Sequence, residues 1–347
     1  MRIGSDARQV LQRALDDGDV PCVVALASGD EQPTALGRVE DGGAPARGDT
    51  LFDLASLTKV VATLPAVLRL IAERQISPDD PVERFFSNAG WFQSPSLGQA
   101  TVRQLLTHGS GLPAWVPFFA RTSERTTALA ALLQTPLAHE PGTVTYSDLG
   151  FMLLGAIAER VTGVRLDEFV TENVLAPLGM NDTSFGPVEA GRAAPTEDCG
   201  WRGRLLRGEV HDENASVWQG VAGHAGLFGT AGDLGRYCRA WLELDARLGP
   251  EELLVEATGL QAGGGTHNRG YGWLLSPQEG LAAPDADGYG HTGFTGTSLW
   301  IDLPTRTAPG GYAILLSNRV YPHRGLRTGM TELRVGFHRA LRAQVQA

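Results

Sequence analysis

The chain has 347 residues, of which 42% are hydrophobic and 20% are charged, a composition typical of a globular protein with a large core. Its formal net charge of -10 argues against a nucleic-acid partner, which would need a basic surface, and against an anionic membrane surface. The three cysteines, Cys22, Cys199 and Cys238, form neither a disulfide framework nor a zinc motif, so we expect small buried residues.

The first 20 residues contain no basic segment followed by an apolar one, so no signal peptide is predicted. No stretch of the chain is apolar over the length that a bilayer span requires. We therefore expect a cytoplasmic protein without a membrane span. Nothing in the sequence indicates an oligomeric state.

Both ends of the chain predict strands and flanking helices. An amphipathic helix follows Ser5, and short β-branched or apolar runs then predict strands. Similar runs near the C-terminus are followed by a helix with apolar residues at helical spacing from Met330 to Val345. The strands are expected at residues 22–28, 34–39, 296–303 and 312–318.

The middle of the chain is predicted to be mostly helical, with helices such as those at residues 56–74 and 149–161 separated by Gly- and Pro-rich loops. We therefore predict an α+β fold. Residues 1–55 and 243–347 would form an antiparallel sheet covered by the terminal helices, and residues 56–242 an inserted, mostly helical domain. A crevice between two such parts is a common place for a ligand site.

The first candidate motif is Ser56-Leu-Thr-Lys59 at the start of an apolar helix. Residues three apart share a helix face, so Lys59 would contact the hydroxyl of Ser56. A serine hydroxyl becomes a good nucleophile when a neighbouring base removes its proton, and burial can lower an amine's pKa for that task. On its own the spacing favours a capping serine and a solvated lysine, but the apolar run at residues 60–62 indicates that part of the lysine stem is buried.

The second candidate is Tyr146-Ser-Asp148, which follows a Pro-Gly turn and precedes a helix. The phenol of Tyr146 could project into the crevice and relay a proton to a leaving group. Asp148 could accept a hydrogen bond from Lys59. The alternative is a structural tyrosine with Ser147 or Asp148 capping the following helix.

The third candidate is His291-Thr292-Gly293, which we expect to begin a strand facing the crevice. Glycine would let a substrate lie against the strand edge. A backbone N–H just after it could form half of an oxyanion hole, with the N–H of Ser56 as the other half. A surface turn with an incidental histidine is the alternative.

Taken together and in this order, the three motifs resemble the serine β-lactamase and penicillin-binding-protein superfamily. The resemblance is greatest to its class C-like branch, which includes esterases and D-amino-acid peptidases. It extends over nearly the whole chain, and TVRQLLTHGSGLP at residues 101–113 is similar to a characteristic segment of that branch. Other similar segments are PDDPVERFF, LAPLGMNDTSF, GVAGHAGLFGTAGDL and ILLSNRVYP.

The resemblance implies a role for each motif residue. Ser56 would be the acylated nucleophile, Lys59 its activating lysine and Tyr146 the tyrosine of the family's Y-x-N motif. The triplet at residues 291–293 would match the K-T-G motif, with the Phe294 N–H as the second oxyanion donor. The implied fold is the sheet with a helical domain described above, and no metal or organic cofactor is implied.

The chain departs from the family pattern at two positions. Asp148 stands where the family has asparagine, and we expect it to pair with Lys59, keep Lys59 more protonated and shift general-base work towards Tyr146. His291 stands where the family has lysine, so we expect a group that titrates near neutral pH instead of a permanent charge. Both changes disfavour penicillins, which carry a carboxylate.

Other polar and aromatic residues fit the chemistry less well. Residues 211–214 (His-Asp-Glu-Asn) have no metal-ligand spacing, and we expect a structural or rim role for them. We take His224 as a secondary candidate and His108 as a structural histidine. Trp115, Phe118 and Phe119 could line an acyl pocket or pack in the core.

We therefore expect a serine hydrolase that forms an acyl-enzyme at Ser56 on a small ester or amide substrate. One alternative is a β-lactamase or D-Ala-D-Ala carboxypeptidase with the same machinery. The other, of a different class, is a non-catalytic ligand-binding module that keeps the fold.

Overall fold

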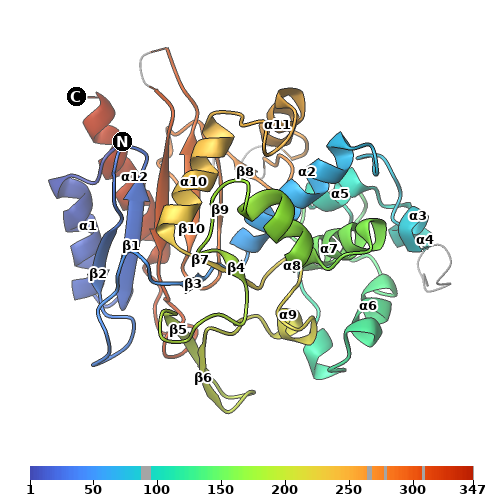
Figure 1. The fold of residues 1–347 in the computed structure, drawn as a ribbon, viewed down its shortest axis with the longest axis horizontal. Coiled ribbons are helices and arrows are strands. Elements are labelled where there is room, and N and C mark those ends of the chain that lie inside the picture. Colours follow the sequence, from blue (N-terminus) through green and yellow to red (C-terminus); the bar gives the residue numbers. More distant parts are fainter. Residues whose placement is uncertain (87–94, 264–267, 277–279, 307–308, 347) are drawn as a thin grey trace.

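The computed structural model describes residues 1–86, 95–263, 268–276, 280–306 and 309–346. Its main feature is a six-stranded sheet in which every neighbouring pair of strands is antiparallel (Figure 1). The spatial order is β2 (Thr34–Gly37), β1 (Cys22–Ala27), β11 (Gly311–Leu316), β10 (Ser298–Asp302), β9 (Gly288–Thr292) and β8 (Leu274–Leu275). Strands from both chain ends thus form one sheet, as the sequence predicts.

Alternation along the central strand β1 explains how the sheet is covered on both faces. Its odd-numbered residues pack under α1 (Ser5–Asp16) and α12 (Met330–Gln346), which lie together on one side of the sheet (Figure 1). Its even-numbered residues pack in the main core, with the side chains of α10 (Ala231–Leu242). All six residues of β1 are buried, which accounts for its unbroken apolar sequence.

Most of the remaining helices gather on the far side of α10 (Figure 1). A π-helix at Lys59–Thr63 leads into α2. The α-helices are α2 (Leu64–Ala72), α3 (Glu83–Phe86), α4 (Pro95–Gln99), α5 (Val102–Leu106), α6 (Arg125–Leu133), α7 (Asp148–Thr162), α8 (Leu166–Val170), α9 (Glu213–Val217) and α11 (Glu251–Thr258). A second π-helix spans Thr171–Leu175, and a 3-10 helix spans Phe118–Ala120.

Two small sheets join the helical part to the main sheet. One has the order β3 (Phe52–Asp53), β7 (Leu227–Gly229), β4 (Ser184–Phe185), and the other pairs β5 (Pro195–Cys199) with β6 (Arg204–Arg207). Because α10 packs on the main sheet, part of the predicted insertion contacts the sheet directly. The division into residues 1–55 plus 243–347 and residues 56–242 stays a prediction.

The third motif lies in a different place on its strand than expected. His291 and Thr292 are the last residues of β9. Gly293 begins the turn to β10, and its N–H donates a hydrogen bond to Thr297 O at 2.8 Å. The sequence prediction that the triplet begins a strand was therefore wrong. The physical reason is the tight turn at residues 293–297, where Gly296 has a φ of +111° that other residues rarely adopt.

The structure also shows the state of the cysteines and the lengths of the helices. All three cysteines are buried and unpaired, as expected of small core residues. No helix within the described ranges is long and apolar enough to cross a membrane.

Candidate active site

Ser56 sits at the start of the π-helix and α2, where the backbone changes direction sharply. Ala55, just before it, has a φ of +47°, in the left-handed region that a residue with a Cβ rarely adopts. The buried carboxylate of Asp53 holds this turn by accepting hydrogen bonds from Ala55 N (2.8 Å) and His211 N (2.7 Å). The surrounding structure thus maintains strain directly beside the predicted nucleophile, which is typical of functional sites.

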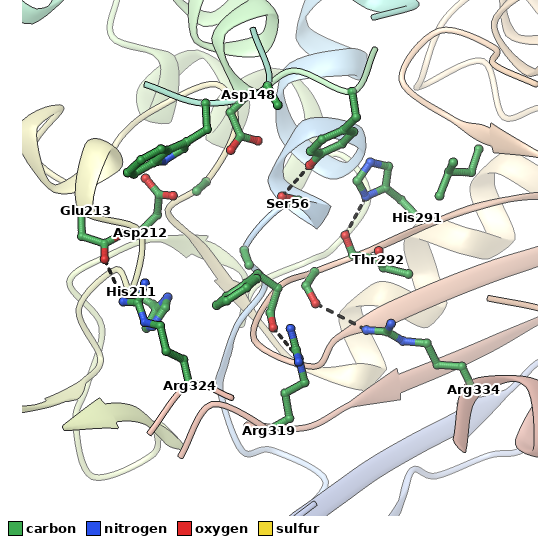
Figure 2. Close-up of a pocket in the computed structure, with 18 of the residues that line it drawn as sticks. Ser56, Asp148, His211, Asp212, Glu213, His291, Thr292, Arg319, Arg324 and Arg334 are labelled. Carbon is green, nitrogen blue, oxygen red and sulfur yellow. Dashed lines mark hydrogen bonds and ion pairs between the residues drawn. The ribbon is translucent and has the colours of Figure 1, made fainter. Parts of the chain in front are cut away.

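The hydroxyl of Ser56 accepts two hydrogen bonds from residues far apart in sequence. Lys59 Nζ lies 3.0 Å from Ser56 Oγ, as expected for residues three apart on a helix. Tyr146 Oη donates to the same oxygen at 2.8 Å and approaches from the loop before α7. The structure therefore brings together the three side chains that the sequence predicts to form one cluster. Ser56 and Tyr146 line a cavity, in which Figure 2 labels Ser56.

Asp148 completes this cluster as a partner of Lys59. It is the first residue of α7, and its Oδ1 lies 2.7 Å from Lys59 Nζ. Burial lowers the pKa of the fully buried Lys59, but the charge of Asp148 and the phenol of Tyr146 raise it more, so the net pKa lies above its usual value. The predicted contact of Asp148 with Lys59 is present, and that Asp148 keeps Lys59 more protonated stays a prediction, which the direction of the pKa favours.

Tyr146 also keeps its proton in the resting cluster. Burial is the main influence and raises the pKa of its phenol, while the charge of Lys59 opposes it. Lys59 Nζ lies 4.9 Å from the centre of the Tyr146 ring, within cation–π range. Ser56 thus faces two proton donors and no ready base.

The peptide after Gly293 is pressed against the segment that carries Ser56. A Cβ at Gly293 would lie 2.6 Å from Leu54 O and 3.4 Å from Ala55 Cβ, so only glycine fits there. Within the described ranges, the N–H groups of Ser56 and Phe294 donate no hydrogen bond to the protein. Both residues line the cavity, so two N–H groups without a protein partner are candidate oxyanion donors, as the sequence predicts.

His291 differs from the sequence-based expectation that it titrates near neutral pH. Its Nδ1 lies 2.8 Å from Thr292 O, which can only accept, so Nδ1 carries the hydrogen. Burial, together with the charges of Lys59 and Arg269, holds the pKa of His291 well below its usual value. His291 is therefore a neutral imidazole, and it does not supply the positive charge of the family's lysine.

The cavity in front of Ser56 has a volume of about 680 Å³, a size that suits a small organic substrate. Asp148 and His291 point into it near Ser56, and Arg319, Arg324 and Arg334 extend from the opposite side (Figure 2). Trp115 lines the cavity, whereas Phe118 is buried in the core and Phe119 packs on Trp115 and Trp201. The aromatic segment thus contributes one wall residue and a supporting stack.

Several residues of the cavity wall were missed or undervalued from the sequence. His211, Asp212 and Glu213 line the cavity at the start of α9. His211 also stacks on the Phe294 ring at 5.7 Å between centroids, which supports the turn that follows Gly293. The arginines of the wall were not singled out, because scattered arginines in a sequence carry no spacing signal.

One group of side chains has the composition of a metal site. Asp148, Asp212 and His224 offer ligand atoms within 4.8 Å of one another. Lys59 already supplies a cation at 2.7 Å from Asp148, and His224 Nε2 lies 3.0 Å from Asp212 Oδ1. Burial raises the pKa of Asp212, but the charge of His224 and its hydrogen bond lower that pKa more. This arrangement is that of a protein-internal charge network, and we assign no metal to it.

A sheet-and-helix fold that holds a Ser-Lys-Tyr cluster at a cavity defines a class of serine hydrolases, and comparison with known proteins agrees. The Beta-lactamase family profile matches residues 7–334. The chain is 35% identical over 314 residues to a putative D-alanyl-D-alanine carboxypeptidase of Escherichia coli O157:H7, an alignment that covers 79% of this chain and 70% of the relative. It is 32% identical over 294 residues to an N-acetylmuramyl-L-alanine amidase of Bacillus subtilis, covering 73% and 65%.

Solved structures share the fold over nearly the whole chain. A D-amino acid amidase from Ochrobactrum anthropi SV3 superposes with a TM-score of 0.76 at 21% identity, over 98% of each chain. The octameric penicillin-binding protein homologue from Pyrococcus abyssi gives 0.73 at 23% identity, over 97% of this chain and 77% of that one. The chain belongs to the Beta-lactamase family, and it is a serine hydrolase of that family.

Proposed function

We propose that the protein hydrolyses ester or amide bonds through an acyl-enzyme at Ser56. The observation that carries this proposal is the double hydrogen bond to Ser56 Oγ, from Lys59 at 3.0 Å and Tyr146 at 2.8 Å, at the wall of the cavity. A serine that only capped the helix would need neither a fully buried lysine nor a phenol from another element. Their presence supports nucleophilic catalysis.

The chemistry balances with these groups alone. Ser56 Oγ forms a bond to the substrate carbonyl carbon, its proton passes to the Lys59–Tyr146 pair, and the carbonyl oxygen becomes an oxyanion between the N–H groups of Ser56 and Phe294. The intermediate collapses as the bond to the leaving group breaks and that group takes the proton. A water molecule then attacks the acyl-enzyme by the same route and releases the acid and the Ser56 hydroxyl.

The protons of the cluster determine which form is active. Both Lys59 and Tyr146 hold their protons at rest, because the net effect of their surroundings raises both pKa values. Activity is therefore carried by the form of the cluster that has lost one proton, and the two groups share that vacancy because they interact closely. Asp148 stabilises the protonated lysine, so the vacancy falls more often on Tyr146.

The names of two relatives and the size of the cavity support a proposal for the substrate class. Two relatives at 35% and 32% identity carry the names putative D-alanyl-D-alanine carboxypeptidase and N-acetylmuramyl-L-alanine amidase, which both denote hydrolysis of an amide bond. We propose a small amide built from amino acids as the substrate class, with small esters cleaved by the same steps. The cavity of about 680 Å³ holds a molecule of that size.

The test combines turnover with direct detection of the acyl group. Wild type should hydrolyse 4-nitrophenyl acetate and take up a fluorophosphonate probe at Ser56, as located by peptide mass spectrometry, and Ser56→Ala should lose both. Ser216→Ala is the matched control, because Ser216 lies on nearby α9 but its Oγ donates to Glu213 O at 2.6 Å. Equal rates in wild type and Ser56→Ala, with no labelling, would instead favour a binding module.

A further inference from the structure

Asp53 differs from the other buried carboxylates in the groups that it binds. Four acidic side chains are buried in the described ranges, and three of them pair with an arginine or a histidine: Glu197, Asp233 and Asp302. Asp53, which is 2% exposed, makes no ion pair with any residue that the structure describes. Burial raises the pKa of its carboxyl group. A buried carboxylate without a cation is costly, so the fold keeps it only through the hydrogen bonds that it accepts.

The partners of the Asp53 carboxylate are main-chain groups from two segments of the cavity wall. Oδ1 accepts from Ala55 N at 2.8 Å, and Oδ2 accepts from His211 N at 2.7 Å. Because each oxygen accepts one N–H, the ionised carboxyl suits both bonds. A side-chain partner can rotate away, whereas two backbone N–H groups on one carboxylate fix two stretches of main chain relative to each other. Asp53 therefore joins the turn before Ser56 to the segment that precedes α9.

Asp53 also anchors the turn that contains Phe294. Its backbone oxygen accepts from Thr295 Oγ1 at 2.7 Å. On the other side of this turn, the ring of His211 stacks on the ring of Phe294. Phe294 is therefore held by its neighbour in the chain and by its ring, through two residues that each bond to Asp53.

These bonds bear on both candidate oxyanion donors. The bond from Ala55 N to Asp53 holds Ala55 at its φ of +47°, and this conformation sets the direction of the next N–H, that of Ser56. The N–H of Phe294 belongs to the turn that the contacts above fix. Asp53 itself does not line the cavity, so it acts on a substrate only through these groups.

We propose that Asp53 is a positioning residue that sets the separation and direction of the two oxyanion donors, Ser56 N–H and Phe294 N–H. This inference rests on the proposed function and adds to it a residue that touches no substrate. Donors that are fixed before the reaction stabilise an oxyanion without reorganising. The charge of Asp53 alone would have the opposite effect, because a carboxylate disfavours a second negative charge nearby. Geometry and charge thus predict opposite results for the loss of this carboxylate.

The test replaces the carboxylate by an amide of the same shape, Asp53→Asn, whose oxygen can accept from only one of the two N–H groups. Two substrates are compared: 4-nitrophenyl acetate and its thiono analogue, in which sulfur replaces the carbonyl oxygen. Sulfur accepts hydrogen bonds weakly, so wild type should prefer the oxygen ester. In Asp53→Asn the ratio of kcat/KM for the oxygen ester to that for the thionoester should fall roughly 10-fold, mainly through kcat of the oxygen ester.

Asp233→Asn is the matched control for the loss of a buried carboxylate. Asp233 is as buried as Asp53, and its Oδ2 accepts from Asp182 N at 2.8 Å, but it does not line the cavity. Its replacement should lower the free energy of unfolding and leave the ratio as in wild type. A second variant, Thr295→Val, removes only the hydroxyl that bonds to Asp53 O, and its ratio should fall by a smaller factor than in Asp53→Asn.

The outcomes separate the two proposals. If wild type cleaves neither ester, the proposed function fails. If wild type cleaves both without preferring oxygen, or if Asp53→Asn lowers both rates equally or neither, Asp53 supports the fold and not the donors, and the inference is overturned. A faster oxygen-ester reaction in Asp53→Asn would overturn it as well, since charge would then outweigh position. Should Asp53→Asn not fold, Thr295→Val decides the matter, and a wild-type ratio in that variant would overturn the inference.

Discussion

Two buried polar clusters in this molecule are built on opposite principles. Between α12 and the main sheet, His338 uses both ring nitrogens: Nδ1 accepts from Ala283 N at 2.9 Å and Nε2 contacts Asp302 Oδ2 at 2.7 Å. Asp302 also accepts from Arg342 Nη1 at 2.9 Å and from Trp300 Nε1 at 3.3 Å. In this cluster, the Asp302 cluster, the central carboxylate and the histidine are fully paired, and Nε of Arg342 is buried without a partner.

Around Ser56 the histidines are only half satisfied. Within the described part of the chain, His108 Nε2, His224 Nδ1 and His291 Nε2 are buried without a partner, as are two nitrogens of Arg269. Buried polar groups are normally paired, so the nitrogens of His291 and Arg269, which line the cavity and have no protein partner, are available to a bound ligand. The Asp302 cluster connects α12 to the main sheet, whereas the residues around Ser56 include buried nitrogens that have no protein partner.

The largest effect on activity is expected from Lys59→Met, which tests whether the Ser56 cluster serves catalysis and not stability. It removes the ammonium that contacts Ser56 Oγ, and we expect kcat/KM for 4-nitrophenyl acetate to fall about 10³-fold, as for loss of a positioned acid–base group. The unfolding free energy should change less than for the Asp302 cluster, because Asp148 is 17% exposed and water can solvate it from the cavity. A stable variant with nearly full activity would contradict the assigned role of Lys59.

The complementary change is Asp302→Asn, which removes the central carboxylate charge of the Asp302 cluster. It leaves His338 and Arg342 without their carboxylate in a buried interface, and we expect a loss of about 3 kcal/mol in urea unfolding. Below its unfolding transition the variant should retain kcat/KM within about twofold, because the residue lies away from the cavity wall. Lost activity with unchanged stability would show that the two clusters are not separate in function.

A smaller effect is expected from Asp148→Asn, which restores the amide of the family motif. Asp148 raises the pKa of Lys59 against the lowering effect of burial, so removing its charge lowers that pKa. The active, deprotonated form then appears at lower pH, and the acid limb of kcat/KM moves to lower pH, with roughly a tenfold gain in rate for each unit of movement.

A matched control for this shift is Glu213→Gln. It changes the charge of the cavity wall equally but acts on Arg324 and not on Lys59. In Glu213→Gln the acid limb of the kcat/KM profile should remain at the wild-type pH. A limb that moves in Glu213→Gln as much as in Asp148→Asn would show that the field of the whole cavity, and not contact with Lys59, sets the profile.

The fold could be predicted from the sequence to a large extent because its signals are local. Apolar runs gave the strands β1, β10 and β11 near their observed positions, and helical spacing gave α1, α7 and α12. The boundary at His291–Gly293 was wrong because it depends on a turn fixed by contacts with Leu54 and Ala55, more than 230 positions away in the chain.

The site could be predicted only where motif spacing carried it. Ser56 and Lys59 are one helical turn apart, and Tyr146 and Asp148 belong to one motif, so their grouping followed from pattern and resemblance. The neutral state of His291 and the unpaired Arg269 could not be predicted, because both depend on burial and on which charges the fold brings near. Sequence spacing records neither.

The subtlest prediction concerns His291→Gln and the stability of the half-satisfied cluster. The folded pKa of His291 lies well below its unfolded value of about 6.5, because burial and the charges of Lys59, Arg269 and Arg334 disfavour the imidazolium. The unfolded chain therefore binds more protons as the pH falls below about 6.5. This histidine's contribution to stability is fully present above that pH and is lost below it, by up to about 1.4 kcal/mol per pH unit.

In His291→Gln this contribution disappears, so the unfolding free energy should fall less steeply between pH 6.5 and 5 than in wild type. His108 adds a similar slope, since burial also holds its pKa well below the usual value, and His108→Gln is the matched comparison. Urea titrations at several pH values measure both. Because burial holds the pKa of His291 well below its usual value, His291→Gln should leave the pH profile of kcat/KM near neutral pH unchanged. A wild-type slope in both variants would mean that these imidazoles are protonated in the folded protein.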